Sequence, residues 1–351
     1  MKKIAIISLE SAGTMGHMTL ITSLASKMSN NKNNKLFVFS QYNYKKLSNL
    51  KNNLVNYIKL PKQESSYTVG GCLNYKPRDL LIRSLIKNKI KIVIFSTFFD
   101  KALLKKIKRL NIKIILISYP LRDSHRKAFF IRKYYSLFDN IFTLKDLFDI
   151  GVNYPNEKIV SPILRTKKQN SNFNPKIKNV LITCGGATRP SSNIFFMKIK
   201  KIVSRIKRHY PSINILVIKA GFRKSFRIKR VTMLKWSTKF LDLINNSDIV
   251  ISEGGYFTLT ELIATCKPAI IIPGERRIDN QELRALRYQE LGGGLTFFPT
   301  EPSKEIKKAL INLIEKPTAL RKFHNNLINI KNTLFSNVPL DVAISKEIKL
   351  I

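Results

Sequence analysis

The sequence has 351 residues, of which 44% are hydrophobic; this excludes a disordered chain and fits two domains better than one. Its cysteines, Cys72, Cys184 and Cys266, are few and scattered, which excludes a disulfide-stapled secreted domain and fits a reducing cytoplasm. The first apolar run ends at Glu10, and no run approaches the roughly 20 residues of a membrane span. We therefore expect a cytoplasmic protein, soluble or attached to the inner face of the membrane.

The formal net charge is +41, from 63 Lys and Arg against 22 Asp and Glu, and the basic residues are spread along the whole chain. We favour codon bias as the main cause, because Lys, Asn and Ile are abundant throughout. Attraction to an anionic membrane surface, worth about 1 kcal/mol per nearby basic residue, comes second. Nucleic-acid binding comes third, because no recognised module is present and aromatic residues do not alternate with basic ones.

Short apolar runs alternate with amphipathic segments along the chain, which is typical of parallel sheets covered by helices on both faces. In the first half the pattern predicts strands at residues 3–8, 35–40, 91–96, 112–118 and 140–143, and helices at 17–29 and 100–110. In the second half it predicts strands at 179–183, 214–219, 248–252 and 268–272, and helices at 195–209, 258–265, 280–291 and within 303–351.

The alternation breaks at residues 151–178, which are rich in Pro, Asn and Lys and read as an interdomain linker. The sequence therefore predicts an α/β fold of two doubly wound, Rossmann-like domains, residues 1–160 and 161–351, with a cleft between them. The last helical segment is expected to pack back on the first domain.

Ligands bind sheets of this kind at the carboxyl ends of the strands. The loop after the first strand carries Gly16 and His17 where a helix begins. Glycine lets the backbone approach a ligand closely, and an imidazole facing the cleft can act as a general base near neutral pH. The alternative is a histidine that only forms hydrogen bonds to its own loop.

The turn at residues 183–192 carries Gly185, Gly186 and Thr188 between a predicted strand and a helix. Backbone N–H groups in such a turn can cradle an anion. The turn lacks the Lys-Ser/Thr pair of a P-loop, which argues against a phosphate-hydrolysing motor. The alternative is a plain connection without a ligand.

The segment 247–262 gives the strongest signal, because Gly254 and Gly255 follow a predicted strand and precede a helix that begins near Thr258. The N-terminus of that helix can hold a diphosphate. Glu261, one turn further along, can accept hydrogen bonds from the two hydroxyls of a ribose. A solvated or capping acid is the alternative for Glu261.

Asn280 and Gln281 follow the next buried strand, at the predicted start of another helix. Adjacent side-chain amides can both donate hydrogen bonds to sugar hydroxyls and accept them. The alternative is a helix N-cap and its neighbour. We expect no metal site and no cofactor.

Taken together, these residues resemble inverting glycosyltransferases of the glycosyltransferase-B fold, in the family 28-like group that includes the peptidoglycan N-acetylglucosaminyltransferase acting on lipid I. The order of features is similar over nearly the whole chain, and the specific matches lie between residues 248 and 294. The resemblance implies His17 as the catalytic base and a nucleotide-sugar donor, UDP-linked in this group. It also implies that Trp236 and Phe240 lie in the loop that holds the nucleotide base of the donor. Arg165 matches loosely a linker arginine that lies near the nucleotide base in this group.

The resemblance leaves the acceptor open, as a lipid-linked molecule or a cell-surface glycan precursor; residues 63–78 and 119–126, with His125 among them, are the candidate acceptor loops. The charge of the leaving diphosphate would be met by backbone N–H groups, with Arg189 or Arg223. Asn280 replaces a family Gln, and Arg284 stands where the lipid I enzyme has a neutral amide, so we expect a different donor sugar. Two alternatives remain: a nucleotide-sugar hydrolase of the same fold, and a basic nucleic-acid-binding protein without catalysis.

Overall fold

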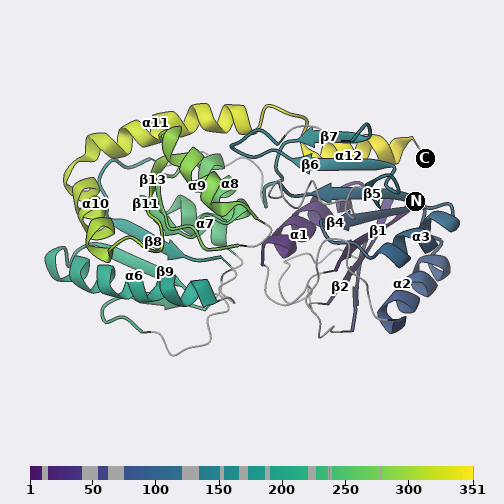
Figure 1. Ribbon diagram of the computed structural model, residues 1–351, viewed down its shortest axis with the longest axis horizontal. Coiled ribbons are helices and arrows are strands. Elements are labelled where there is room, and N and C mark those ends of the chain that lie inside the picture. The colour runs from purple at the N-terminus through teal and green to yellow at the C-terminus, as the bar shows by residue number, and fades with distance from the viewer. Residues whose placement is uncertain are drawn as a thin grey trace. The chain divides into compact units, whose positions relative to one another are not determined.

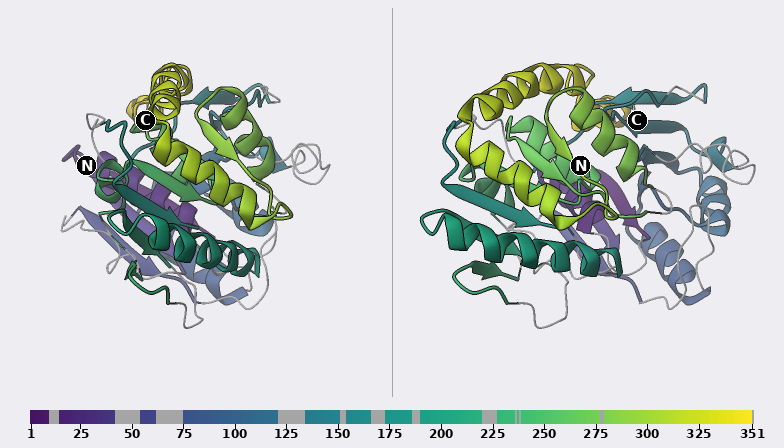
Figure 2. Two further views of the ribbon diagram at one scale, coloured as in Figure 1. Left: turned by 90° about the vertical axis from the view of Figure 1, so that its left-hand side faces the viewer. Right: turned by 60° about the vertical axis from the view of Figure 1, so that its left-hand side comes forward.

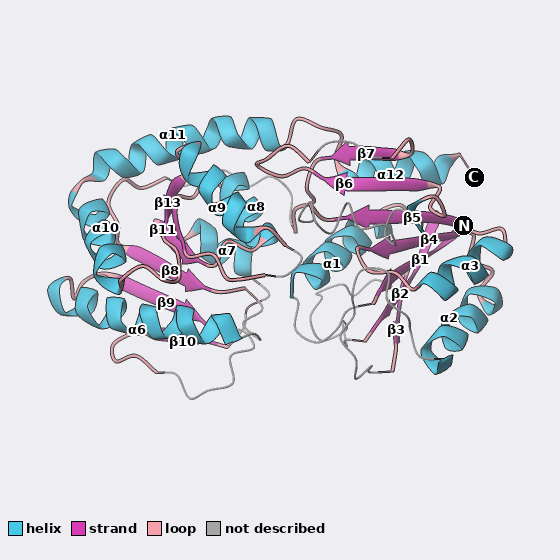
Figure 3. Cartoon of the chain, viewed as in Figure 1, coloured by secondary structure: helices cyan, strands magenta, loops and turns pink. Residues whose placement is uncertain are grey.

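The computed structural model describes residues 1–9, 15–41, 54–61, 75–120, 134–150, 154–165, 173–185, 190–219, 227–235, 237, 239–276 and 279–350. The chain divides into two compact units (Figure 1). Unit 1 comprises Met1–Arg165 and Phe335–Ile351, and unit 2 comprises Thr166–Leu334. Each unit is built around a parallel sheet with helices (Figure 3), which confirms the predicted α/β class of two Rossmann-like domains.

The sheet of unit 1 has the strand order β3-β2-β1-β4-β5-β6-β7, and every neighbouring pair is parallel. Residues Ile4 to Ile7 of β1 have no exposed surface, which is why this strand is apolar at every position rather than at alternate ones. The elements are β1 (Lys2–Ser8), α1 (Met15–Ser29), β2 (Asn34–Ser40), β3 (Val55–Lys59), α2 (Tyr75–Lys87), β4 (Ile92–Ser96), α3 (Lys101–Arg109), β5 (Lys113–Ser118), β6 (Asn140–Leu144), β7 (Glu157–Val160) and α12 (Leu340–Lys349).

The sheet of unit 2 has the order β10-β9-β8-β11-β12-β13 and is also parallel throughout. Its elements are β8 (Asn179–Thr183), α6 (Pro190–His209), β9 (Asn214–Ile218), β10 (Thr232–Leu234), α7 (Phe240–Asn245), β11 (Ile249–Ser252), α8 (Tyr256–Ala264), β12 (Ala269–Ile271), α9 (Gln281–Glu290), β13 (Gly294–Thr296), α10 (Ser303–Glu315) and α11 (Pro317–Leu334).

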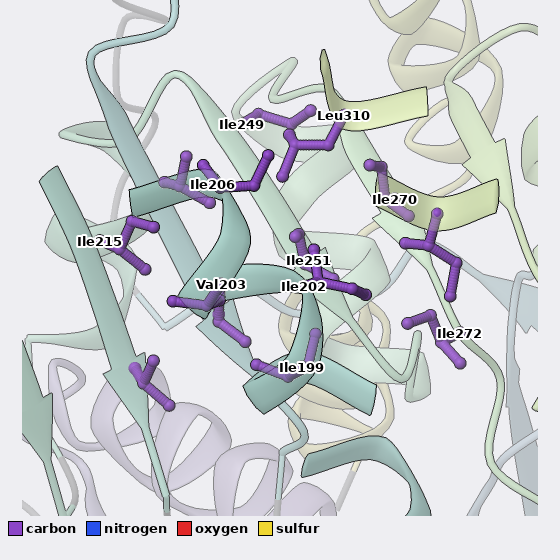
Figure 4. Close-up of a cluster of buried hydrophobic side chains, with 14 of the residues drawn as sticks. Ile199, Ile202, Val203, Ile206, Ile215, Ile249, Ile251, Ile270, Ile272 and Leu310 are labelled. Atoms are coloured by element: carbon purple, nitrogen blue, oxygen red, sulfur yellow. The ribbon is translucent and has the colours of Figure 1, made fainter. Parts of the chain in front are cut away.

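The core of unit 2 forms where α6 and α10 pack on one face of this sheet (Figure 4). Ile202 and Ile206 of α6 and Leu310 of α10 meet Ile249 and Ile251 of β11 in one buried cluster. Val250, between those two strand residues, points to the opposite face and is equally buried. Both faces of the sheet are therefore covered, and the helices around it can be followed in Figure 2. In sheets covered in this way, ligands bind at the carboxyl ends of the strands.

The structure adds elements that the sequence pattern did not predict, namely β3, α2, β7, β10, α7 and β13. The predicted linker is wrong in part, because β7 lies inside residues 151–178 and forms the edge of the sheet of unit 1. Residues 75–78 of the candidate acceptor loop begin helix α2, and 119–120 are the described part of the other loop. Short strands at sheet edges carry too few apolar residues to stand out.

The domain boundaries differ from the predicted residues 1–160 and 161–351 at both ends of unit 2. Unit 1 extends to Arg165 and also includes the C-terminal segment Phe335–Ile351. Within the described residues, no helix combines the length and the apolar character needed to cross a membrane.

Helix α12 is fastened to the sheet of unit 1 by Glu347. Its carboxylate accepts hydrogen bonds from Lys113 Nζ at 2.9 Å and Lys158 Nζ at 3.1 Å, which makes two ion pairs. Burial by itself raises the pKa of this carboxyl, but the two lysines outweigh burial and the net direction is downward. A lowered pKa in the folded state means that the ionised carboxylate stabilises the fold.

We expect Glu347→Gln to lower the free energy of unfolding at pH 7 by about 1–2 kcal/mol, below the cost of breaking a fully buried pair, because solvent screens Lys158. The stabilisation from Glu347 is complete above its unfolded pKa of about 4.3 and is lost as the pH falls through the lower folded pKa. Urea unfolding between pH 7 and pH 3 should therefore show a shallower loss of stability in the variant.

The matched control is Glu290→Gln, which removes an exposed carboxylate paired with Arg287 at 2.6 Å. Both side chains of this pair are more than half exposed, so we expect a change below about 0.5 kcal/mol. Equal losses in the two variants, or an unchanged pH dependence in Glu347→Gln, would contradict the role of Glu347.

Candidate functional site

The strand order of unit 2 reverses between β8 and β11. The chain adds β9 and β10 on one side of β8 and then returns to add β11, β12 and β13 on the other. In folds of this kind, such a reversal of the strand order marks a crevice at the carboxyl end of the sheet, which is the usual ligand position. Thr183 and Ser252, the last residues of the two strands, are register partners.

Both strands end in the same kind of turn. The hydroxyl of Thr183 accepts a hydrogen bond from the Gly185 N–H at 3.3 Å, and that of Ser252 accepts one from the Gly254 N–H at 3.3 Å. Gly185 and Gly254 have φ angles of +61° and +69°, in the left-handed region that favours glycine. Two glycine turns thus lie side by side at the crevice, and both belong to the predicted anion-binding loops.

Helix α8 begins immediately after the second turn. Its N-cap is Gly255, and no side chain caps it, so the first N–H groups and the positive end of the helix dipole face this loop. Thr258 is 8% exposed and Glu261 1% exposed. The predicted diphosphate and ribose residues therefore lie on one buried helix whose N-terminus is at the crevice.

Gln281 connects the two loops around this helix start. Its Oε1 accepts a hydrogen bond from the Gly274 N–H at 3.2 Å, and its Nε2 lies 3.6 Å from where a Cβ on Gly255 would be. Asn280, by contrast, is the N-cap of α9, and its Oδ1 accepts a hydrogen bond from the Leu283 N–H at 3.4 Å. The two adjacent amides thus have different local partners.

Arg284, which stands where the lipid I enzyme has a neutral amide, lies inside unit 2. Its side chain is 1% exposed, and Nη2 pairs with Asp279 Oδ1 at 2.8 Å. Its guanidinium carbon lies 5.2 Å from the centre of the Tyr256 ring, within the range of a cation–π contact. Arg284 therefore joins the first residue of α8 to the residue that precedes Asn280.

Sequence reasoning missed an ion pair in the same loops. Arg276 Nη2 donates to Glu253 Oε2 at 2.7 Å, and the two side chains are 14% and 3% exposed. The thiol of Cys184 lies in the same environment: burial raises its pKa first, the Glu253 charge raises it further, and Arg276 opposes the rise. Two features of the sequence could have indicated this pair. Glu253 lies between a strand and two glycines, and Arg276 lies just after the next strand.

The remaining predicted residues lie elsewhere or outside the described residues. His17 belongs to α1 of unit 1, its side chain is not described, and Gly16 beside it is partly buried. Phe240 begins α7 and is buried. Arg165 is partly buried. Gly186, Thr188, Arg189, Arg223, Trp236 and His125 lie outside the described residues. Among the described residues there is no cluster of three or more His, Cys, Asp or Glu that could hold a metal ion.

Comparison with known proteins points to one family. Residues 198–334, from within α6 to the end of α11, match the glycosyltransferase family 28 C-terminal domain. A UDP-N-acetylglucosamine--N-acetylmuramyl-(pentapeptide) pyrophosphoryl-undecaprenol N-acetylglucosamine transferase from Prochlorococcus marinus (strain MIT 9312) is 26% identical over 168 residues, 46% of each chain. The chain spans about half the length of the curated relatives it matches.

Solved structures agree on the fold over the whole chain. MurG of Acinetobacter baumannii has a TM-score of 0.65 at 11% identity, with 100% of both chains covered. Phytolacca americana UGT2, solved with UDP-2-fluoro-glucose and pterostilbene, has a TM-score of 0.66 at 14% identity, covering 95% of this chain and 94% of that one. At these identities the similarity shows a common fold.

We expect Gly254→Ala to destabilise unit 2 more than Gly185→Ala does. Both substitutions force alanine into the left-handed region, at about 1–2 kcal/mol. A Cβ at Gly254 would in addition meet Ile271 Cγ2 at 2.6 Å, whereas one at Gly185 meets nothing within 4 Å. Overpacking of this kind adds about 1–3 kcal/mol. Thermal or urea unfolding of the two variants measures the difference, and equal destabilisation would contradict the close packing at Gly254.

Proposed function

The chain is a family 28-like protein of the glycosyltransferase-B fold, and on this basis we propose that it is an inverting glycosyltransferase that uses a nucleoside diphosphate sugar. The observation that carries the proposal is the crevice between β8 and β11, where two glycine turns and the uncapped N-terminus of α8 meet. Such an arrangement suits a diphosphate, because backbone N–H groups and the helix dipole both favour negative charge.

The donor lies along α8 and the start of α9 in this proposal. Glu261, one turn into α8, accepts hydrogen bonds from the ribose hydroxyls. Asn280 and Gln281 contact the sugar, and Gln281 is held in place by the Gly274 N–H. The full set of proposed donor-binding residues is Gly16, Gly185, Gly186, Thr188, Trp236, Phe240, Gly254, Gly255, Thr258, Glu261, Asn280 and Gln281.

The names of the relatives suggest the nucleotide base of the donor and the class of acceptor. The Prochlorococcus marinus relative is named for a UDP-N-acetylglucosamine donor and a pyrophosphoryl-undecaprenol acceptor. We propose a UDP-linked donor and a lipid-linked acceptor for this chain as well, used at the inner face of the membrane. The positive charge of the chain, +41, would favour an anionic lipid surface.

His17 is the proposed catalytic base. It takes the proton of the acceptor hydroxyl while the oxygen attacks the anomeric carbon from the face opposite the diphosphate. The bond from that carbon to the diphosphate oxygen breaks, a glycosidic bond forms, and the configuration is inverted. The N-terminus of α8 stabilises the negative charge of the departing diphosphate, so that the step needs no metal ion.

We expect Glu261→Gln to weaken UDP-sugar binding about 10–100-fold, because hydrogen bonds to a charged group contribute about 1.5–3 kcal/mol. Gln keeps the volume of the side chain in a position that is 1% exposed, so the fold should be retained. Calorimetric titration with UDP-N-acetylglucosamine and related UDP-sugars measures the effect. Glu290→Gln, on the exposed side of α9, is the control; unchanged affinity in Glu261→Gln would remove Glu261 from the site.

We expect His17→Ala to reduce turnover by about 10²–10⁴-fold, the usual contribution of a general base, and to leave donor affinity unchanged. His209→Ala, at the exposed end of α6, should retain full turnover. Release of UDP, followed with and without a lipid-linked acceptor, measures both variants. Full activity in His17→Ala would exclude its role as the base, and sugar release independent of any acceptor would support a hydrolase instead.

A further inference from the structure

The ion pair between Glu253 and Arg276 joins the loops that follow two neighbouring strands. Glu253 comes directly after β11, and Arg276 lies in the loop that follows β12. Gly274 passes beside the pair: a Cβ there would lie 3.3 Å from Glu253 Cδ and 3.4 Å from Arg276 Nη2. The loop backbone is therefore packed closely against both charged groups.

The two charges differ in their access to solvent. The Glu253 side chain is 3% exposed, whereas 14% of the Arg276 side chain reaches the surface. Burying a carboxylate is costly unless it is paired, so the pair holds Arg276 in one position rather than leaving it a freely moving surface side chain. An anion approaching from solvent would meet the guanidinium before it met the carboxylate.

Short contacts connect Arg276 to the N-terminus of α8. Arg276 lies against Gly274, Gly274 donates its N–H to Gln281 Oε1 at 3.2 Å, and the Gln281 amide lies 3.6 Å from the Cβ position of Gly255, the N-cap of α8. A planar guanidinium presents several N–H donors in a geometry that matches phosphate oxygens. Arg276 and the N-terminus of α8 can thus bind the same diphosphate.

We propose that Arg276 binds the diphosphate of the donor and that Glu253 is its positioning residue. The inference rests on the proposed function, because it places Arg276 beside the anion that the glycine turns and α8 would hold. Arg276 would then supply the side-chain cation for the charge of the leaving diphosphate, the role for which Arg189 or Arg223 was predicted.

The test compares UDP, uridine and inorganic pyrophosphate as probes of the full chain by calorimetry or by competition against a fluorescent UDP-sugar. We expect Arg276→Ala to weaken UDP and pyrophosphate about 10–100-fold, the range for a charge-assisted hydrogen bond, and to leave uridine unchanged. Arg276→Lys should recover part of the affinity, because it keeps the charge without the planar fork. Arg287→Ala, an exposed arginine on α9, should bind all three probes as the unmodified chain does.

Glu253→Gln separates positioning from charge neutralisation. If Glu253 holds the guanidinium in place, the UDP affinity of the variant should fall about 3–10-fold, which is less than the contribution of one strong hydrogen bond. Its affinity for uridine should stay unchanged. Tighter UDP binding would show that Glu253 only offsets the charge of Arg276 and would overturn its positioning role. Thermal unfolding of each variant confirms that the comparison is made between folded proteins.

The results of this experiment distinguish a failure of the Arg276 proposal from a failure of the proposed function. Wild-type UDP affinity in Arg276→Ala, or an equal loss for uridine and UDP, would overturn the role of Arg276 while leaving the proposed function intact. An unmodified chain that binds none of the three probes would overturn the proposed function itself.

Discussion

In unit 2 the chain changes the side on which it adds strands between β8 and β11, and the remaining features of the candidate site depend on that change. Parallel neighbours end at the same edge of the sheet, and their loops can diverge only where the order reverses. The turns at Gly185 and Gly254 lie at this point, and the second of them delivers the chain to the N-terminus of α8. In the proposed function, the strand order of the sheet thus sets where the diphosphate would be held, before any side chain contributes.

Side chains then fix the loops around that point. Gln281 joins the Gly274 loop to Gly255, and Arg284 joins the residue before Asn280 to Tyr256. These contacts come from α9 and reach α8, so the two helices that would hold the donor are positioned together. A donor site built on rigid elements can keep hydrogen-bond donors in place before the ligand arrives.

Several of the described acidic residues have structural partners. The carboxylate of Asp248 accepts the N–H groups of Lys178 and Asn179 at 2.7 Å each, at the start of β8. Asp100 caps α3 through the Leu103 N–H at 2.5 Å and pairs with Arg78 of α2. Glu347 fastens α12. In a chain with 22 acids against 63 basic residues, Asp100 and Glu347 each pair with basic side chains from another segment of the chain.

The sequence by itself determined the class of fold, because continuous β-branched runs separated by amphipathic helices require a parallel sheet covered on both faces. It also located the glycine turns and Glu261, since the glycines mark the ends of strands and the acid follows one helical turn later. Only the tertiary structure decided what Glu253, Arg276 and Arg284 contact, because their partners lie on other strands and helices that no local pattern connects. The sequence also predicted that the last helical segment returns to the first domain, but only the structure identified the contacts that hold α12 there, because the lysines that pair with Glu347 are more than 180 residues away in the chain.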